Sequence, residues 1–400
     1  MSRILITVFT FTLYCSSSAA ILVNNSKKAI DACKGNLDLR LLRIWGGPDE
    51  QDENRYFTTP ISMAIDSNNT LYICDMHNHC LKVFGSTGEY LRTIGRRGQG
   101  PGDLMGPGKV TIAPNGDIVV FESGGFRLQR FNPEGKSKRI IIIPRAPGWI
   151  GITSKNEIAL YSWLTTFLSK RIISFMDETG KTIREIGYHD DHANNYIDSE
   201  KLDIAMDDSD RLYVANMWTP VIRRYTSDGE LQIAVTFESP LSINTQIKLN
   251  PTETEIEISR PDEGSLSYAK KDTQGNVLVD KRGKPRPIIV HGIAVDEKSR
   301  IYVVTPRRAL TESENQATRV SGSIDGISRK LVDFNITENI NIDRLLVFNG
   351  NGEICGEAPI RGMCDDIYIH KNRLFIIDAY INQRILEYEI IIKDDNLKKS

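Results

Sequence analysis

Three residues of types that bind metal ions stand at similar places in a repeated sequence pattern. Asp203, His291 and Asp365 each lie at the start of an apolar segment that we expect to be the first strand of a repeat unit. Carboxylates and imidazoles are ordinary ligands of calcium and zinc. If the starts of these strands converge, the three side chains form a candidate site for a divalent cation. The simpler alternative, favoured for His291, is a histidine that holds no metal.

A wider candidate binding site follows from the same convergence. Residues at the starts of first strands and the ends of second strands would gather at one mouth of a central channel. Exposed aromatic side chains in a concave mouth are common where peptides or sugars bind. The alternatives are that the tryptophans pack under linkers and that Asp75, Asn216 and Asp378 cap hairpin turns. The candidate ligand-binding residues are Lys109, Trp149, Trp163, Asp203, Asn216, Trp218, His291 and Asp365.

Other kinds of chemistry find little support in the sequence. It contains no GxSxG, HExxH or P-loop motif, so neither nucleophilic hydrolysis nor nucleotide chemistry is indicated. His189 and His192 lie in a polar stretch, YHDDHANN, for which a solvated loop is the simpler interpretation. The formal net charge of -2 gives no basic face, which makes nucleic acid a poor candidate partner.

The N-terminus has the pattern of a secretory signal. Arg3 precedes an apolar run of about ten residues, and small residues follow, which suits cleavage after Ala20. Such a run is too short for an uncleaved anchor to span a bilayer. A lipoprotein signal is disfavoured because Tyr14, and not a small residue, precedes Cys15. We therefore predict an exported protein, secreted or periplasmic, with no membrane span after cleavage.

Export would permit disulfide bonds among the five cysteines that remain after cleavage. Cys74 with Cys80 and Cys355 with Cys364 flank short chain reversals and are the disulfide candidates, which leaves Cys33 over. The alternative is that all five are free and partly buried. No CxxC spacing occurs, so a zinc site built from these cysteines is less favoured.

The elements that must position these residues are short strands in repeated groups of four. Residues 61–95 read ISMAIDSNNTLYICDMHNHCLKVFGSTGEYLRTIG, four apolar runs separated by turn signals, which is typical of an antiparallel meander. The same pattern recurs with a period of about 45 residues where no insertion intervenes. The later units are 110–143, 151–187, 202–238, an interrupted unit that begins at 291 and resumes at 343, and 364–392.

The sixth unit lacks a fourth strand, and residues 39–46 read as a last strand with no meander before it. Pairing this N-terminal strand with the last unit would close a ring and remove its open edges. We therefore predict an all-β fold, a six-bladed β-propeller of four-stranded antiparallel blades. Its expected limits are a signal peptide at 1–20, a linker at 21–38, the propeller at 39–392 and a polar tail at 393–400.

The repeats resemble those of the NHL-repeat six-bladed propellers. The resemblance rests on SMAID…LYICDMHNHCLKVFGSTGEYLRTIG, LDIAMDDSDRLYVANMWTPVIRRYTSDGEL and RLFIIDAYINQRILEY, and on the linker GRRGQGPGDLMGP at 95–107. It covers nearly all of 39–392 and implies the fold; propellers like these include binding proteins, sensor domains and a few enzymes. Some propellers similar to this one are peptide α-amidating lyases or gluconolactonases. The lyases place histidines at several first strands, where this sequence has only His291.

Two long insertions interrupt the repeats, at 239–290 and 306–342. By the strand order of a propeller both fall on the face that carries the loops between second and third strands, here named the upper face. Long loops in a compact domain are often functional, although decoration without function is the alternative. The first insertion holds an expected strand pair, TEIEIS with NVLVD.

Three functions remain open from the sequence. The first is a monomeric binding module that holds a peptide, glycan or protein partner on its upper face. The second is a lyase or lactonase-like enzyme with calcium or zinc at the channel mouth. The third is a scaffold that docks a larger assembly. The absence of a catalytic motif favours the first.

Overall fold

The computed structural model describes residues 20–143, 147–161, 171–188, 202–217, 219–240, 246–249, 256–259, 289–308, 311 and 341–393. Residues 1–19 of the predicted signal peptide, most of both insertions and residues 394–400 of the polar tail lie outside these residues.

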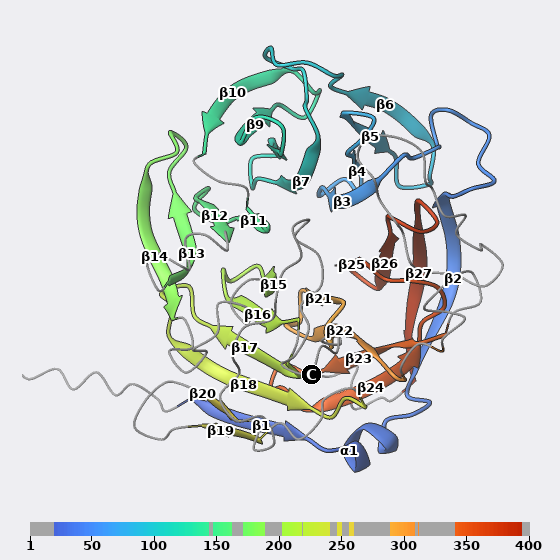
Figure 1. Cartoon of the computed structure of the whole chain (residues 1–400), viewed down its shortest axis with the longest axis vertical. Coiled ribbons are helices and arrows are strands. Elements are labelled where there is room, and N and C mark those ends of the chain that lie inside the picture. The colour runs from blue at the N-terminus through green and yellow to red at the C-terminus, as the bar shows by residue number, and fades with distance from the viewer. Residues whose placement is uncertain are drawn as a thin grey trace, which may run out of the picture.

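Six four-stranded antiparallel sheets form a ring around a central axis (Figure 1). Blade one is β3 (Pro60–Ile65), β4 (Leu71–Asp75), β5 (Cys80–Phe84) and β6 (Tyr90–Ile94). Blade two is β7 (Pro107–Ile112), β8 (Ile118–Glu122), β9 (Arg127–Phe131) and β10 (Ser137–Ile142). Blade three is β11 (Trp149–Ile152), β12 (Ile158–Tyr161), β13 (Arg171–Met176) and β14 (Thr182–Tyr188).

Blades four to six continue the ring. Blade four is β15 (Leu202–Met206), β16 (Leu212–Asn216), β17 (Val221–Tyr225) and β18 (Leu231–Phe237). Blade five is β21 (Gly292–Val295), β22 (Ile301–Pro306), β23 (Asp343–Phe348) and β24 (Ile354–Pro359). Blade six is β25 (Asp366–His370), β26 (Arg373–Asp378), β27 (Arg384–Ile392) and, from the other end of the chain, β2 (Leu37–Gly46).

The predicted closure is confirmed. Strand β2 pairs antiparallel with β27, from Leu37 opposite Ile392 to Gly46 opposite Arg384. The first strands of neighbouring blades touch all the way round, in the order β3, β7, β11, β15, β21, β25 and back to β3. The two ends of the propeller are therefore joined within one sheet, and the innermost strands form a continuous lining of the axis.

The hydrophobic core lies between the blades and not at the axis. Six buried clusters each combine side chains of two adjacent sheets; that between blades one and two, for example, packs Tyr72 and Leu81 against Val120 and Phe131. Burial of apolar surface between sheets is the main term that stabilises such a ring. The innermost strands can therefore carry polar side chains toward the axis.

In several blades an aspartate stabilises the turn between the first and second strands by accepting backbone hydrogen bonds. Asp66, Asp207 and Asp296 each accept hydrogen bonds from two backbone N–H groups of their own turn, at 2.8–3.0 Å. Each turn also contains a residue with positive φ, such as Asn69 at 62° and Asp210 at 59°, a conformation that Asn and Asp tolerate better than most side chains. These turns fix where each second strand begins.

The segment 21–38, which was expected to be a linker, instead forms ordered structure along three blades. Strand β1 (Ile21–Asn25) pairs parallel with β18 as a fifth strand of blade four, and helix α1 (Lys27–Ala32) follows. The side chain of Asn25 donates to the carbonyls of Thr236 and Gly352 and accepts from Ile354 N–H, so it joins blade four to blade five.

No helix in the described part of the chain is long and apolar enough to cross a membrane.

In the first insertion, β20 (Ile256–Ser259) lies within the expected strand TEIEIS, but its partner is β19 (Gln246–Leu249). The segment NVLVD, predicted as the partner, lies outside the described residues. A hairpin between neighbouring segments closes a shorter loop than the predicted pair would, which favours it entropically.

The disulfide predictions were wrong, because Cys74, Cys80 and Cys364 are free cysteines. In the blade-one hairpin Cys80 stands opposite Asp75, and Cys74 stands opposite Leu81, so the two thiols are offset by one residue pair. Burial, followed by the Asp75 charge, raises the pKa of Cys80 to about 12. Such thiols remain protonated and unreactive at neutral pH.

Candidate functional site

A chain of polar contacts runs along the lining of the axis, from blade one to its neighbours, blades two and six. The backbone N–H of Val110 donates to Ser62 Oγ at 3.2 Å, and Ser62 Oγ lies 3.1 Å from Tyr368 Oη. Tyr368 Oη donates to Asp366 Oδ2 at 3.1 Å, and Lys109 Nζ reaches the same oxygen at 3.3 Å. An ion pair therefore spans the lining of the axis.

Asp203 supplies the third charge of this site. Its Oδ1 accepts from its neighbour Ile204 N–H at 3.0 Å, and its Oδ2 accepts from Ile293 N–H of the next blade at 2.8 Å. Lys109, Asp203 and Asp366 come from blades two, four and six. Each pairs with the residue before the last of its second strand, namely Phe121, Ala215 and Ile377. We name Lys109, Asp203, Asp366 and Tyr368 the channel cluster.

The charges of the channel cluster act on one another. Burial raises the pKa of Asp203 to about 7, with a further upward contribution from Asp366, and Lys109 only partly opposes the rise. Burial by itself would lower the pKa of Lys109, but Asp366, Tyr368 and Asp203 together raise it above its ordinary value. Lys109 is therefore an ammonium ion at neutral pH, and it serves as a charge and a hydrogen-bond donor and not as a nucleophile.

Asp365, predicted to lie at the channel mouth, comes one residue before the position that is equivalent in register to Asp203. Its Oδ2 accepts from Ala379 N–H at 2.8 Å and more weakly from Tyr380 N–H at 3.4 Å. Asp366, the next residue, takes the place of Asp203 in blade six. Asp365 as a residue is exposed, but desolvation of its carboxyl group, opposed by the Ala379 hydrogen bond and reinforced by Asp378, raises its pKa to about 6.

His291 forms a pair with a residue that the sequence did not single out. Its Nδ1 lies 3.0 Å from Oδ2 of Asp343, the first residue of β23. Asp343 is 0% exposed, and within the described residues its other oxygen, Oδ1, has no hydrogen-bond partner. We name His291, Asp343, Cys364 and Asp365 the junction cluster, because they lie where blade five meets blade six.

The two clusters adjoin each other. Burial raises the pKa of the Cys364 thiol, and the charges of Asp343, Asp365, Asp366 and Asp203 add to that shift. Four carboxylates from three blades are therefore near enough to act electrostatically on one buried thiol. The predicted metal ligands Asp203, His291 and Asp365 do not form a joint site: among the described residues no three such side chains are grouped so that they could hold a metal ion.

The remaining predicted site residues lie elsewhere. Trp149 is half-buried and packs against the core between blades three and four. Asn216 is buried at the end of β16. Trp163 and Trp218 lie outside the described residues. Asp75 accepts from Thr58 and Thr59 N–H, which agrees with a capping role.

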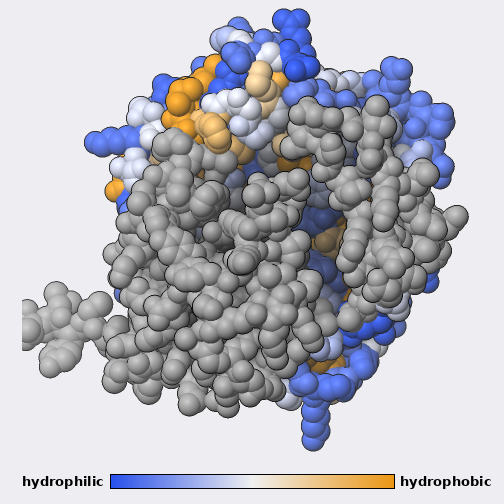
Figure 2. All heavy atoms as spheres, in the orientation of Figure 1, coloured by the Kyte–Doolittle hydropathy of each residue, from blue (hydrophilic) through white to orange (hydrophobic). Residues whose placement is uncertain are grey.

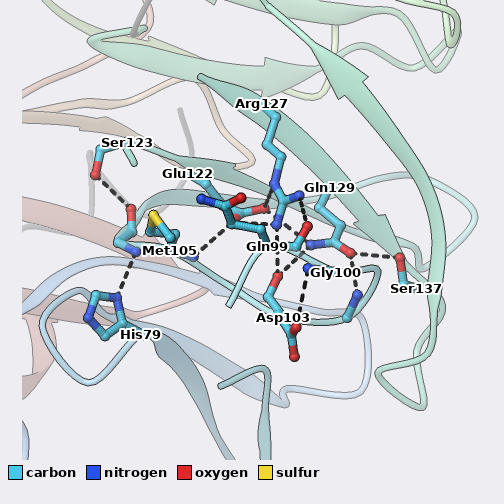
Figure 3. Close-up of polar contacts among 12 residues, drawn as sticks. His79, Gln99, Gly100, Asp103, Met105, Glu122, Ser123, Arg127, Gln129 and Ser137 are labelled. Carbon is cyan, nitrogen blue, oxygen red and sulfur yellow. Dashed lines mark hydrogen bonds and ion pairs between the residues drawn. The ribbon is translucent and has the colours of Figure 1, made fainter. Parts of the chain in front are cut away.

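A second buried charged network lies beside β8 and β9 (Figure 3). Both oxygens of Glu122 accept two hydrogen bonds: Oε1 from Arg127 and Gln129 at 2.8 and 3.1 Å, and Oε2 from Arg127 and the Met105 N–H at 3.0 and 2.8 Å. Glu122 is 0% exposed. We name Glu122, Arg127 and Gln129 the latch.

The latch holds the linker between blades one and two. Arg127 donates to the carbonyls of Gln99 and Asp103 at 2.6 and 3.1 Å. Gln129 donates to the carbonyl of Asp103 at 2.9 Å and accepts from Gly102 N–H at 2.6 Å. Backbone groups of the linker thus account for much of the hydrogen bonding of the latch, and its role is structural.

The outer rim carries exposed apolar side chains near β10, where Figure 2 shows an apolar patch on the face in view. Phe126 and Ile142 are 50% and 72% exposed and adjoin, because Ile143 N–H donates to the Phe126 carbonyl. The patch is small, and single exposed apolar residues are common on protein surfaces.

Six blades closed by an N-terminal strand, with charged groups on the innermost strands, define a six-bladed β-propeller with a candidate ligand site at its axis. A model of the DUF5128 family, a 6-bladed beta-propeller, matches residues 53–259, just over half of the chain. The chain therefore belongs to this family.

The chain is also 27% identical over 135 residues to the Drosophila melanogaster protein brain tumor; that match takes in 33% of this chain and 12% of the fly protein. It supports the NHL-like character of the repeats.

Two solved structures of Bacteroides proteins share the fold. One is a candidate exported protein of Bacteroides fragilis, with a TM-score of 0.54 and 13% identity over 94% of this chain and 100% of the other. The second, a member of the DUF4221 family from Bacteroides vulgatus, has a TM-score of 0.54 and 12% identity over 89% of this chain and 99% of the other. At such identities the likeness concerns the fold alone.

Proposed function

We propose that this protein is an exported binding propeller that takes its ligand at the upper mouth of the channel, on the channel cluster. The observation that carries the proposal is the Lys109–Asp366 ion pair with Asp203 beside it. The side chains of Lys109 and Asp366 keep 27% and 16% of their area exposed although they line the axis of the ring. Charged groups that converge in a concave, partly accessible place are typical of ligand sites.

The contacts of the cluster support binding over a purely structural role. Among the described residues Lys109 Nζ makes one hydrogen bond, at 3.3 Å, whereas an ammonium has three donors. The innermost strands already contact each other around the ring. A ligand that reaches Lys109 would therefore add interactions without breaking those that hold the blades.

Among the described residues, an exposed aromatic ring near the two clusters is that of Tyr380, between β26 and β27. It is 59% exposed. Partial desolvation of the phenol raises its pKa, the Asp365 charge adds to the rise and the Lys109 charge opposes it, so the side chain lies within the field of both clusters. An exposed tyrosine close to charged groups suits a peptide or glycan ligand.

Binding is preferred to the enzyme alternative. Lys109 is held as an ammonium, and burial with four nearby carboxylates keeps Cys364 protonated. Neither residue is therefore an activated nucleophile.

A melting-temperature screen tests the proposal. Wild type and the double variant Lys109→Met/Asp203→Asn are screened against amino acids, short peptides, sugars and polar metabolites. A ligand at a hundred times its Kd stabilises the native state by about 2.7 kcal/mol, so hits should raise the Tm of wild type and not that of the double variant. Ligands that stabilise both proteins equally would place the site elsewhere.

Export is supported by the N-terminal sequence pattern and by the start of β1 at Ile21, immediately after the predicted cleavage site. We expect the chain, produced in a secreting host, to appear outside the cytoplasm with Ile21 as its first residue. N-terminal sequencing measures this directly. An intact N-terminus on cytoplasmic protein would contradict it.

A further inference from the structure

A hairpin loop of blade one, residues 76–79, contacts the entries of two innermost strands. Its His77 Nδ1 lies 2.6 Å from Oγ1 of Thr59, the residue before β3. Its His79 Nδ1 accepts a hydrogen bond of 3.0 Å from the backbone N–H of Gly106, the residue before β7 (His79 in Figure 3). The loop therefore helps to fix where both strands begin.

These two strands carry residues of the candidate ligand site. Ser62 follows Thr59 by three residues on β3, and Lys109 follows Gly106 by three residues on β7. The strands are also joined directly, because Val110 N–H donates to Ser62 Oγ. A change in a loop contact therefore acts close to the lining of the axis.

The two histidine contacts need different protonation states. Thr59 Oγ1 donates its proton to the Thr58 carbonyl at 2.6 Å, so it accepts from His77 Nδ1–H. His79 Nδ1 faces a backbone N–H, so this nitrogen carries no proton. An imidazolium donates from both nitrogens. Protonation therefore preserves the His77 contact and removes the His79 contact, in which two donors would face each other.

Gly106 depends on this contact. The residue is buried, and within the described residues the acceptor for its N–H is His79 Nδ1. A buried backbone N–H without an acceptor is costly. On its other side the linker stays fixed, because Ser123 donates twice to the Gly106 carbonyl and Glu122 accepts from Met105 N–H. Loss of the His79 contact would therefore loosen the start of β7 without unfolding the blade.

We propose that His79 is a pH-sensitive switch, whose neutral form fastens the start of β7 to blade one and whose protonated form releases it. Because Lys109 lies on β7, release would alter how firmly the ammonium of the channel cluster is held. That effect on a ligand rests on the proposed function; the switch itself requires no ligand.

The surroundings of His79 favour its neutral form. Partial burial lowers its pKa below the ordinary 6.5, and the charges of Arg97 in the linker and His77 in the loop lower it further. The unfolded chain therefore binds this proton more readily than the native state does. Stability is unaffected above pH 6.5 and falls as the pH drops from there through the folded-state pKa. Arg97 is a cation throughout this range, so it cannot replace the lost contact.

The test uses NMR and hydrogen exchange on the full chain without a ligand. Selective ¹⁵N labelling of the six histidines reports the tautomer and the pKa of each. Exchange is followed in the peptide that covers 104–110, from pH 8 to about one unit below the measured pKa of His79. Wild type, His79→Asn and His77→Asn are compared at the same pH, which cancels the intrinsic pH dependence of exchange.

His79→Asn is the informative variant. Asn can place Oδ1 where His has Nδ1, and it tolerates the positive φ of 56° at this position. It keeps an acceptor for Gly106 N–H and does not titrate. His77→Asn is the matched control on the same loop, and assigns the two histidine signals together with His79→Asn.

We expect neutral His79 to be the Nε2–H tautomer with a pKa below 6.5, and neutral His77 to be the Nδ1–H tautomer. Exchange in 104–110 should be equal in wild type and His79→Asn at pH 8. At the acid end it should be at least about threefold faster in wild type, as expected for loss of local protection. His77→Asn should follow wild type.

An Nδ1–H tautomer for His79, or a pKa at or above 6.5, would contradict the switch, because the ring would then not serve as the acceptor for Gly106. Equal exchange in wild type and His79→Asn at the acid end would also overturn it. Since no ligand takes part, either failure leaves the proposed function standing, and failure of the melting screen leaves the switch standing.

Discussion

The latch and the channel cluster are both groups of charged side chains, but they differ in burial and in hydrogen bonding. The side chains of Glu122 and Arg127 of the latch are 0% and 10% exposed, whereas those of Asp366 and Lys109 of the channel cluster are 16% and 27% exposed. In the latch each carboxylate oxygen of Glu122 accepts two hydrogen bonds. Arg127 and Gln129 donate hydrogen bonds to Glu122 and to backbone carbonyls of the linker. In the channel cluster Lys109 makes one long contact, and Asp203 carries a pKa raised to about 7.

This difference in hydrogen bonding distinguishes polar groups that stabilise the propeller from polar groups that are available to bind a ligand. A buried network whose members are all paired specifies one arrangement of the chain. A network with spare donors and surplus charge costs stability and is retained where a ligand completes it. The blade junctions therefore supply rigidity, and the axis supplies the candidate binding site.

The largest expected effect is in the latch. Glu122→Ala leaves Arg127 buried without its carboxylate, and removal of one member of a buried pair costs about 3–5 kcal/mol. Urea unfolding measures the loss, with the exposed Glu134→Ala as the matched control. If Glu122→Ala lowers the unfolding free energy by less than about 1 kcal/mol, the latch does not have the structural role assigned to it.

A smaller effect, with a characteristic pH dependence, is expected at Asp203. The folded-state pKa is raised from the ordinary 3.8 to about 7, so the native state binds the proton more tightly than the unfolded chain. Stability from this group is present below pH 3.8 and is lost as the pH rises toward 7, by about 1.4 kcal/mol for each pKa unit. Asp203→Asn should flatten the decline of unfolding free energy between acid and neutral pH.

Asp365, whose pKa is raised to about 6, also makes the unfolding free energy fall as the pH rises, but over a lower pH range than Asp203. The comparison is therefore between variant and wild type at each pH, which cancels the Asp365 contribution. Parallel pH profiles would show that Asp203 titrates normally and that the channel carries no surplus charge.

The smallest effect is expected at Tyr368. Tyr368→Phe removes the hydroxyl that donates to Asp366 and contacts Ser62, and loss of one such hydrogen bond costs about 1 kcal/mol. The same urea assay measures it. A loss as large as that of Glu122→Ala would show that the channel cluster holds the ring together, contrary to its assignment as a ligand site.

The sequence predicted the repeat, the number of blades and the ring closure, because turn residues recur in each unit and residues 39–46 supply the strand that the sixth unit lacks. It did not predict β1, since a parallel strand pair with β18 has no local turn signal. The segment ILVNN alone looked like a linker.

The site was predicted in part. Lys109 and Asp203 were chosen as candidates and both belong to the channel cluster, but Asp365 was chosen where Asp366 holds the register position equivalent to that of Asp203. A shift of one residue turns a side chain to the other side of a strand, and in CDDIYI two adjacent aspartates leave that choice open. Asp343 was missed because 306–342 separates it from the start of its blade, which concealed its place opposite His291.

The most direct test of the central claim is hydrogen exchange with and without a ligand found by the melting screen. We predict slower exchange in peptides that cover β7, β15, β21 and β25, including the Ile204 and Ile293 amides that donate to Asp203. The outer strands β6 and β10 should be unchanged. Protection confined to those outer strands, with the innermost strands unaffected, would contradict a binding site at the axis of the ring.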